Sequence, residues 1–369
     1  MKQGWEIKKI KDICDKASSN IAQNKITELD GDYPVFGASG FVQNVDFYHQ
    51  GTEYIGIVKD GSGVGRVNKY PAYSSLLGTL QYILPKEGYD LNYVAYALKS
   101  LNLAEFASGA AIPHIYFKDY GEEAIPVPPR AEQERIVAEL DCLSGVIEKK
   151  REQLKELDAL AQSIFYQMFG DPITNEKGWE IKKLGEVCDV RDGTHDSPKY
   201  LECSDYVLIT SKNITNDGNI DFSTANYISK EDYESINKRS YVESGDIIMA
   251  MIGTIGKPII VKETDKKFCI KNVALIKFGY STMGINTYIQ ALLNNPDYGQ
   301  YIQSQNKGGT QKFVALGTIR NLTIPLPPIE IQQQFANKIN EIEKLKSQLK
   351  QSIKDAEELF NSRMNHYFN

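Results

Sequence analysis

Polar side chains and glycines follow the short apolar runs of this sequence, where strands are expected to end. Residues 54–58 (YIGIV) lead into KDGSGVGR, which ends at Arg66, and residues 247–252 (IIMAMI) lead into GTIGK, which ends at Lys257. Side chains placed in this way can hydrogen-bond base edges and phosphate oxygens. The candidates for nucleic-acid contact are Ser39, Lys59, Ser62, Arg66, Thr194, His195, Lys199, Ser211, Lys212, Asn213 and Lys257.

Arg66 and Lys257 are the strongest of these candidates, because the glycines before them allow another molecule to approach the backbone closely. Taken singly, each candidate is also what an ordinary solvated loop contains. The interpretation therefore depends on the elements that place these residues.

The sequence contains no recognisable catalytic constellation. It has 4 histidines and 5 cysteines, with no HExxH motif and no CxxC pair. The segment GTIGKP is too short for a phosphate-binding loop and has proline where that loop needs Ser or Thr. No Asn/Asp-Pro-Pro-aromatic motif marks an amino-methyltransferase site. We therefore predict that the chain itself is not an enzyme and binds no cofactor or metal.

Composition limits the class of protein. The net charge is −6, which requires any DNA footprint to be a local patch. No apolar run approaches the about 20 residues that span a bilayer, and the first residues lack the apolar core of a signal peptide. The odd number of cysteines favours reduced thiols, and Cys14 and Cys188 occupy equivalent positions that suit buried apolar groups. We expect a cytoplasmic protein without membrane contact.

Two variable regions carry the candidate residues. Residues 17–123 and 191–323 both combine short β-type runs with glycine turns, and helices are expected at Leu91 to Leu103 and at Met283 to Leu293. This pattern predicts two α+β domains with loops gathered at strand ends.

The segments that frame these regions occur twice. GWEIKK, starting at Gly4, recurs at Gly178, and IPVPPRAEQ, starting at Ile125, recurs as IPLPPIEIQ at Ile324, an offset of 324 − 125 = 199 residues. After the prolines, apolar residues alternate in steps of four and three, which is the a/d pattern of a coiled-coil seam. Lys150, Lys346 and Arg363 interrupt the two seams.

The predicted boundaries follow from these repeats. They are a first domain (residues 1–124), a first spacer helix (125–169), a linker (170–177), a second domain (178–323) and a second spacer helix (324–369). Eight linker residues span at most about 28 Å, whereas a helix of about 40 residues spans about 60 Å. The second domain must therefore start near the far end of the first helix, and paired helices must run antiparallel.

The duplicated frame resembles the specificity subunit of type I restriction-modification systems, with the strand-end loops resembling its target recognition domains. The segment GGTQK resembles a recognition loop as well and adds Thr310, Gln311 and Lys312 to the candidates. The first domain has GAAIPH at the equivalent position, so His114 and the nearby Tyr116 are the candidates there.

The resemblance implies an α+β fold with two pseudo-symmetric target recognition domains separated by an antiparallel coiled coil of two long helices. It implies that each domain recognises one half of a bipartite double-stranded DNA target. Two methyltransferase (modification) subunits would dock on the frame and use S-adenosylmethionine. Restriction (translocase) subunits, which use ATP and Mg, can join such complexes.

Two other classes of function stay open at this point. A nuclease with an unrecognised site would cleave DNA as a purified single chain, and a protein-protein scaffold would not bind DNA. The charged outer faces of the helices, such as residues 148–152 (EKKRE), are either solvated or the docking surface for another subunit.

Overall fold

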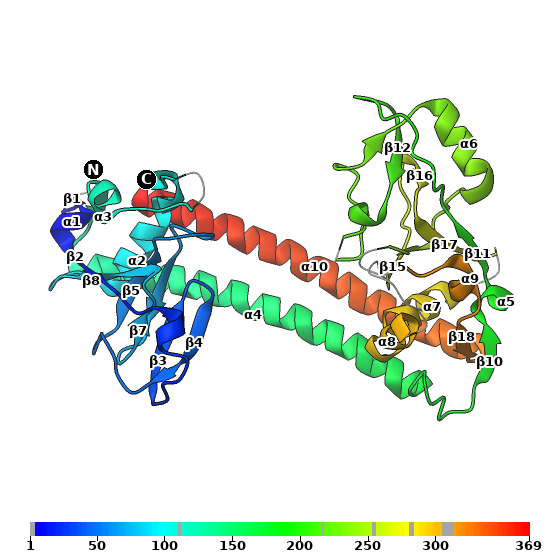
Figure 1. Cartoon of the computed structure of the whole chain (residues 1–369), viewed down its shortest axis with the longest axis horizontal. Helices are drawn as coiled ribbons and strands as arrows, with labels where there is room; N and C mark the ends of the chain where they lie inside the picture. Colours follow the sequence, from blue (N-terminus) through cyan, green and yellow to red (C-terminus); the bar gives the residue numbers. More distant parts are fainter. Residues whose placement is uncertain (1–3, 110–111, 216, 253–255, 280–283, 305–312) are drawn as a thin grey trace. The chain divides into compact units, whose positions relative to one another are not determined.

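The chain divides into two compact units, each of which is described by itself. Unit 1 is Met1–Glu152 with Gln351–Asn369, and unit 2 is Gln153–Lys350. The computed structural model (Figure 1) describes residues 4–109, 112–215, 217–252, 256–279, 284–304 and 313–369. The helices α4 (Arg130–Phe169) and α10 (Ile329–Phe368) each have 40 residues and contribute to both units.

Module 1, which belongs to unit 1, extends from β1 to β9. Its elements are β1 (Glu6–Lys9), α1 (Ile10–Ile13), β2 (Cys14–Ser18), η1 (Gln23–Lys25), β3 (Tyr33–Gly37), β4 (Gly40–Val45), β5 (Tyr54–Val58), β6 (Val67–Tyr70), β7 (Ser75–Leu76), β8 (Leu80–Pro85), α2 (Leu91–Ser100), η2 (Leu103–Phe106), α3 (Phe117–Tyr120) and β9 (Ala124–Val127). The strands form three sheets, ordered β2-β8-β5-β6, β4-β3-β7 and β1-β9.

Module 2, which belongs to unit 2, extends from β10 to β18. Its elements are β10 (Glu180–Lys183), α5 (Leu184–Val187), β11 (Asp189–Asp192), β12 (Tyr206–Ile209), η3 (Ser211–Asn213), β13 (Asn226–Tyr227), α6 (Lys230–Ser240), β14 (Ile247–Ala250), β15 (Gly256–Ile260), β16 (Lys267–Ile270), β17 (Val273–Lys277), α7 (Ile285–Asn294), α8 (Pro296–Ser304), α9 (Leu316–Arg320) and β18 (Thr323–Leu326). The sheets are ordered β11-β17-β14-β15, β13-β12-β16 and β10-β18.

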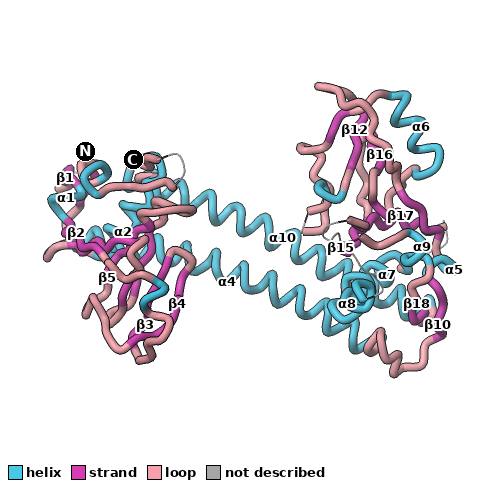
Figure 2. Tube along the Cα trace, viewed as in Figure 1, coloured by secondary structure: helices cyan, strands magenta, loops and turns pink. Residues whose placement is uncertain are grey.

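The two modules share one topology, strand for strand. In each module the three-stranded sheet has one antiparallel and one parallel pair. In each module the first and last strands form an antiparallel ribbon in the same register. Figure 2 shows the strands of both modules in magenta. The predicted mixed fold of two repeated domains is confirmed.

Continuous apolar runs became the central strands. β5 and β14 are buried along their whole length, as expected for short apolar runs bounded by turns. Cys14 and Cys188 lie in the cores of their modules. Burial raises the pKa of each thiol to about 12, so both are the inert buried groups that their equivalent positions predicted.

In unit 1, the first part of α4 packs antiparallel on the last part of α10. Ile136 and Leu140 are fully buried in one core with Tyr367 and its neighbours. The Glu139 carboxylate accepts a hydrogen bond from Tyr367 Oη at 2.6 Å and pairs with Arg363 Nε at 2.7 Å. Arg363, which interrupts the predicted seam, therefore stabilises it through an ion pair.

The same arrangement occurs in unit 2 between the last part of α4 and the first part of α10. Phe165 and Phe169 pack around Phe335, with ring centroids 5.9 and 5.0 Å from it. Lys346, the polar position in the second seam, pairs across the helices with Asp158 at 2.8 Å. Two of the three interruptions, Lys346 and Arg363, thus make interhelical contacts. The predicted antiparallel pairing holds within each unit.

A buried glutamine of the repeated proline motif holds the segment before each helix. Gln133 donates through Nε2 to the carbonyl of Pro128 at 2.9 Å, and Gln332 donates to Pro327 at 2.7 Å. Both amides are buried, so they satisfy carbonyls just before the first helical turn. This contact accounts for the glutamine that ends both copies of the repeated proline motif.

Several predicted boundaries were wrong by a few residues. The spacer helices begin at Arg130 and Ile329, not at residues 125 and 324, because the prolines of these segments lie in or next to strands β9 and β18 and cannot donate hydrogen bonds within a helix. The helix expected to end at Leu103 ends at Ser100, where Asn102 adopts a left-handed conformation with φ of 45°. α7 begins at Ile285, and Met283 lies outside the described residues.

Candidate nucleic-acid interface

Three loops of module 2 meet where its parallel strands end. The amide of Lys271, just after β16, donates to the carbonyl of Ile209 at the end of β12, at 2.9 Å. The amide of Thr194, just after β11, donates to Ile270 at 3.0 Å. We call the loops 193–199, 210–213 and 271–272 the strand-end edge of module 2. β12 and β16 lie side by side in Figure 2.

Glycine is required at the start of this edge. A Cβ at Gly193 would lie 2.2 Å from the carbonyl oxygen of Ile270, so only glycine allows the loop to pass so close to β16. The close approach brings the predicted residues Thr194 and His195 beside the loop after β16.

His195 is held between two polar partners. Its Nδ1 lies 2.8 Å from Asn272 Oδ1, and its Nε2 lies 2.9 Å from Asp192 Oδ2. The hydrogen bond with Asn272, followed by the one with Asp192, raises the pKa of His195. Asp192 is buried and also pairs with Arg239 at the end of α6. The imidazole is more than half exposed, so this edge presents a side chain whose cationic form is favoured.

The rest of the edge is polar and mostly exposed. Lys199 and Lys212 are exposed, Ser211 is half-buried, and the ammonium group of Lys271 donates to Ser197 Oγ. The structure thus brings together five predicted residues from two loops. It adds Arg239, Lys271 and Asn272, which sequence reasoning missed. The sequence feature that could have identified Lys271 and Asn272 is that they form the two-residue polar connection between the apolar runs KFCI and VALIK.

Asn213 has a structural role instead of the predicted contact. It is 3% exposed. Its Oδ1 accepts from Thr210 N at 2.9 Å, and its Nδ2 donates to Asp221 O and Thr224 Oγ1 at 3.3 and 3.2 Å. The amide is fully used inside the module, so we remove Asn213 from the candidate DNA contacts.

We expect Asn213→Ala to destabilise the protein without removing a direct contact to DNA. Removing the amide leaves buried donors and acceptors unpaired, which costs about 1–3 kcal/mol of unfolding free energy. Chemical denaturation measures this loss. Ser211→Ala, two residues away at a half-buried position of the same turn, is the matched control and should change stability little. Equal stability of the two variants would contradict the structural assignment.

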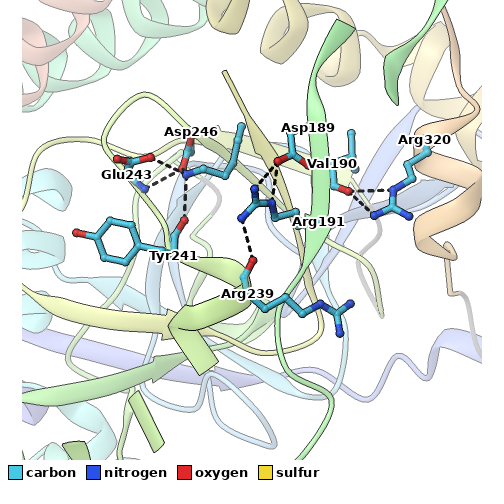
Figure 3. Close-up of polar contacts among 9 residues, drawn as sticks. Asp189, Val190, Arg191, Arg239, Tyr241, Glu243, Asp246 and Arg320 are labelled. Atoms are coloured by element: carbon cyan, nitrogen blue, oxygen red, sulfur yellow. Dashed lines mark hydrogen bonds and ion pairs between the residues drawn. The ribbon is translucent and has the colours of Figure 1, made fainter. Parts of the chain in front are cut away.

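Polar contacts also fix α6 and the following loop to the sheet (Figure 3). Arg191 pairs with Asp189 and donates through Nη1 to the carbonyl of Arg239 at 3.0 Å. Lys277 Nζ donates to the carbonyl of Tyr241 at 3.0 Å and pairs with Asp246 at 2.7 Å. These bonds position the end of α6, from which Arg239 reaches the strand-end edge.

The equivalent place in module 1 is a cleft of about 680 Å³ that contains Ser39. It lies where β2, β3 and β7 end, and the amide of Leu77 donates to Phe36 O at 2.8 Å, matching the contact between Lys271 and Ile209. The cleft is lined by uncharged residues: Asn20, Ile21, Ala22, Gln23, Gly37, Ala38, Ser39, Gly40, Phe41, Val42, Leu77, Gly78 and Thr79. The two modules therefore present different chemistry at equivalent strand ends.

The glycine turn of module 1 lies next to this cleft. The amides of Lys59 and Asp60 donate to Thr79 O at 3.0 and 3.3 Å, and Thr79 lines the cleft. Gly63 and Gly65 have φ of 94° and 85°, which is why the turn needs glycine. The Arg66 guanidinium folds back onto the carbonyls of Gly63 and Ser62, at 3.2 and 3.3 Å.

The segment containing His114 and Tyr116 packs on this turn. Ile115 N donates to Lys59 O at 3.0 Å, His114 pairs with Asp60, and the rings of His114 and Tyr116 are 4.1 Å apart. In module 2, Val314 N donates to Met251 O at 3.0 Å. Val314 is 199 positions after Ile115, which is the offset of the repeat. The contacts that these two residues make are therefore equivalent in the two modules.

The remaining candidates are placed only in part. Lys257 is an exposed residue of β15 with φ of 54°, and it follows β14 as Arg66 follows β5. Thr310, Gln311 and Lys312 lie outside the described residues, as do residues 253–255 of the glycine turn before Lys257.

In the part of the chain that the structure describes, no three His, Cys, Asp or Glu side chains are grouped so that they could hold a metal ion. Within the same residues, no helix combines the length and apolarity needed to cross a membrane.

Comparison with known proteins gives consistent matches. The family described as the type I restriction modification DNA specificity domain matches residues 2–159 and 176–356. The type I restriction enzyme MjaIX specificity subunit of Methanocaldococcus jannaschii is 24% identical, covering 90% of this chain and 85% of the relative. The MjaVIII specificity subunit of the same organism is 25% identical, covering 93% of this chain and 87% of the relative.

The fold has a counterpart among solved structures. The crystal structure of the type I restriction-modification S subunit from M. genitalium aligns with a TM-score of 0.62 and 15% identity, covering 99% of this chain and 96% of that one. Since the family match includes both modules and most of the chain, the protein belongs to the family of type I restriction-modification DNA specificity subunits.

Proposed function

We propose that each module recognises one half of a bipartite double-stranded DNA target and that the chain itself is not catalytic. One observation carries this proposal: the modules have the same strand order, while the side chains at their equivalent strand ends differ. Module 2 presents His195, Lys212 and Lys271, and module 1 presents the uncharged cleft around Ser39. Equivalent placement of unlike side chains is what two unlike half-sites require.

Under this proposal the catalytic groups belong to partners. Two modification subunits supply the methyltransferase activity with S-adenosylmethionine, and a restriction subunit, where present, uses ATP and Mg. The helices α4 and α10 set the spacing of the half-sites, and their charged outer faces help to dock the modification subunits. Within that proposed face, Arg151 pairs with Glu357 across the helices while its side chain stays 59% exposed. Lys149, which is exposed, remains part of the proposed face.

Lys271→Ala tests whether the strand-end edge of module 2 binds DNA. Each phosphate contact contributes about 0.9 to the slope of log affinity against log salt concentration, so the variant should lower that slope by about one. The measurement is a binding titration of the complex with its modification subunits on target DNA at several salt concentrations.

Lys155→Ala, an exposed residue of α4, is the matched control for the loss of one charge. An unchanged slope for Lys271→Ala together with unchanged affinity would remove the edge from the DNA interface. Failure of the wild-type complex to prefer any DNA sequence would overturn the proposed function as a whole and would favour a protein scaffold.

A further inference from the structure

The ribbons β1-β9 and β10-β18 have the same arrangement of main-chain groups. Pro126 is opposite Ile7, and Pro325 is opposite Ile181. Proline has no N–H to give to the partner strand, so these pairs are the non-hydrogen-bonded pairs of the ladder. The carbonyl of Pro126 accordingly accepts from Tyr93 Oη at 2.7 Å, on the side away from β1, and the carbonyl of Pro325 accepts from Tyr288 Oη.

It follows that the N–H and C=O groups of Ile7 and Ile181 face the open side of each ribbon. Ile10 N donates to Glu123 O at 3.0 Å, and Leu184 N donates to Leu322 O at 2.8 Å. These bonds indicate the same alternation of hydrogen-bonded and non-hydrogen-bonded pairs along each ribbon. On β10 the amide of Lys183, which faces the same side, is capped by Glu186 at 3.0 Å. Among the described residues, the stretch without a partner strand is therefore centred on one isoleucine in each module.

The side chains along these edges are identical, and all are exposed except the half-buried Lys8 and Lys182. Ile7 and Ile181 are 52% and 50% exposed, and both strands have the sequence EIKK with the same burial pattern. The internal contacts of a ribbon do not require identical residues at exposed positions. The modules differ at the strand ends that we assign to unlike half-sites, and they agree at these edges.

We propose that the open edges of β1 and β10 each bind an extended segment of a partner that is present in two identical copies. Resting on the proposed function, this partner is the modification subunit. The segment adds a third strand to the ribbon by exchanging main-chain hydrogen bonds with the isoleucine. An apolar residue of the segment packs beside the exposed isoleucine side chain as a cross-strand neighbour.

The duplication decides between this partner and a second copy of the chain. Pairing of both edges with other copies of the chain would build rings or open-ended filaments. Two copies of a different subunit instead fill both edges and close the complex. A two-stranded ribbon is only marginally stable alone, and an added strand stabilises it.

Proline at the isoleucine positions is a specific test, because proline is tolerated where a strand N–H faces away from the sheet. Ile7→Pro removes the outward-facing backbone N–H of β1, and Ile181→Pro removes the corresponding N–H of β10. The double variant removes both. Ile7→Thr and Ile181→Thr keep the N–H and the β-branch, so they isolate the apolar contact. Circular dichroism and thermal unfolding check that each variant is folded.

Native mass spectrometry of the chain with its modification subunit gives the stoichiometry. We expect two subunits on the wild-type chain, one tightly bound subunit on each single proline variant, and a loss of about tenfold in affinity at each altered edge. The double variant should bind both subunits about tenfold more weakly, and the threonine variants should be intermediate.

Two bound subunits at unchanged affinity on the double proline variant would overturn the inference and leave the proposed function intact. No bound subunit on the wild-type chain would overturn the proposed function itself. If the chain alone self-associates and the double variant does not, the occupant is a second copy of the chain, which also overturns the inference.

Discussion

Exchanging residues 184–322 for the corresponding region of a relative is expected to change one half of the methylated DNA sequence and leave the other half unaltered. These boundaries keep the ribbon β10-β18 and both helices of the original chain. They move paired groups together, including Leu184 with Leu322 and Arg320 with the carbonyl of Val190, which are hydrogen-bonded at 2.7 to 2.9 Å. The inserted region carries its own strand-end edge, so it brings its own contacts to base edges.

Methylome sequencing of a host that carries the exchanged chain with the modification subunit measures the result. The matched control exchanges residues 10–123 of module 1, which should alter the opposite half of the motif. If a single exchange altered both halves, the modules would not act independently. A folded chimera that methylated the original sequence would remove the interior of module 2 from recognition.

Deleting one heptad from each helix at facing positions is expected to shorten the spacer between the two half-sites by about three base pairs. The deletions are residues 152–158 of α4 and 346–352 of α10. They remove both partners of the ion pair between Asp158 and Lys346 and retain the pair between Arg151 and Glu357. Seven helical residues correspond to about 10 Å, or about three base pairs at roughly 3.4 Å each.

The deletion also tests how rigidly the helices define the spacing. One heptad falls about 20° short of two full helical turns, whereas three base pairs rotate the DNA by about 100°. Because of this difference in rotation, we expect the double-deletion protein to methylate the shortened target more slowly than the parent protein methylates the parent target. Deleting the heptad from α4 alone is the control, and it should misalign the seam and lower stability. A folded double-deletion protein that methylated the original spacing would show that the helices do not set it.

The sequence predicted the parts of this fold that follow from local pattern. Apolar runs became β5 and β14, and the a/d spacing placed Ile136, Leu140 and Phe335 in the helix seams. The pattern could not show what Lys346 and Arg363 do there, because their partners Asp158 and Glu139 come from the other helix. Helix starts were misplaced because the proline segments hydrogen-bond to a strand more than 100 positions away.

The sequence predicted the type of the candidate interface but only some of the residues that form it. Strand-end polar residues identified Thr194, His195 and Lys212, but the same rule included Asn213, whose amide is used internally. Lys271 escaped it because only two residues separate the runs KFCI and VALIK, and Arg239 escaped it because it lies in a helix. What brings them to the edge is a parallel strand pair and the end of a helix, which are tertiary features.

The way the helix ends are placed has a consequence for the order of the gene. Phe169 ends α4 in the core of unit 2, where its carbonyl accepts from Trp179 Nε1 at 2.9 Å. Phe368 ends α10 in the core of unit 1, against which Trp5 packs. Each unit therefore contains the end of one helix beside the start of the module that would follow it. A chain opened within residues 170–177 and rejoined from residue 369 to residue 4 by a similar linker would have the same contacts in both units. Circular permutation at these two points is therefore expected to reverse the order of the modules in the gene without altering either unit.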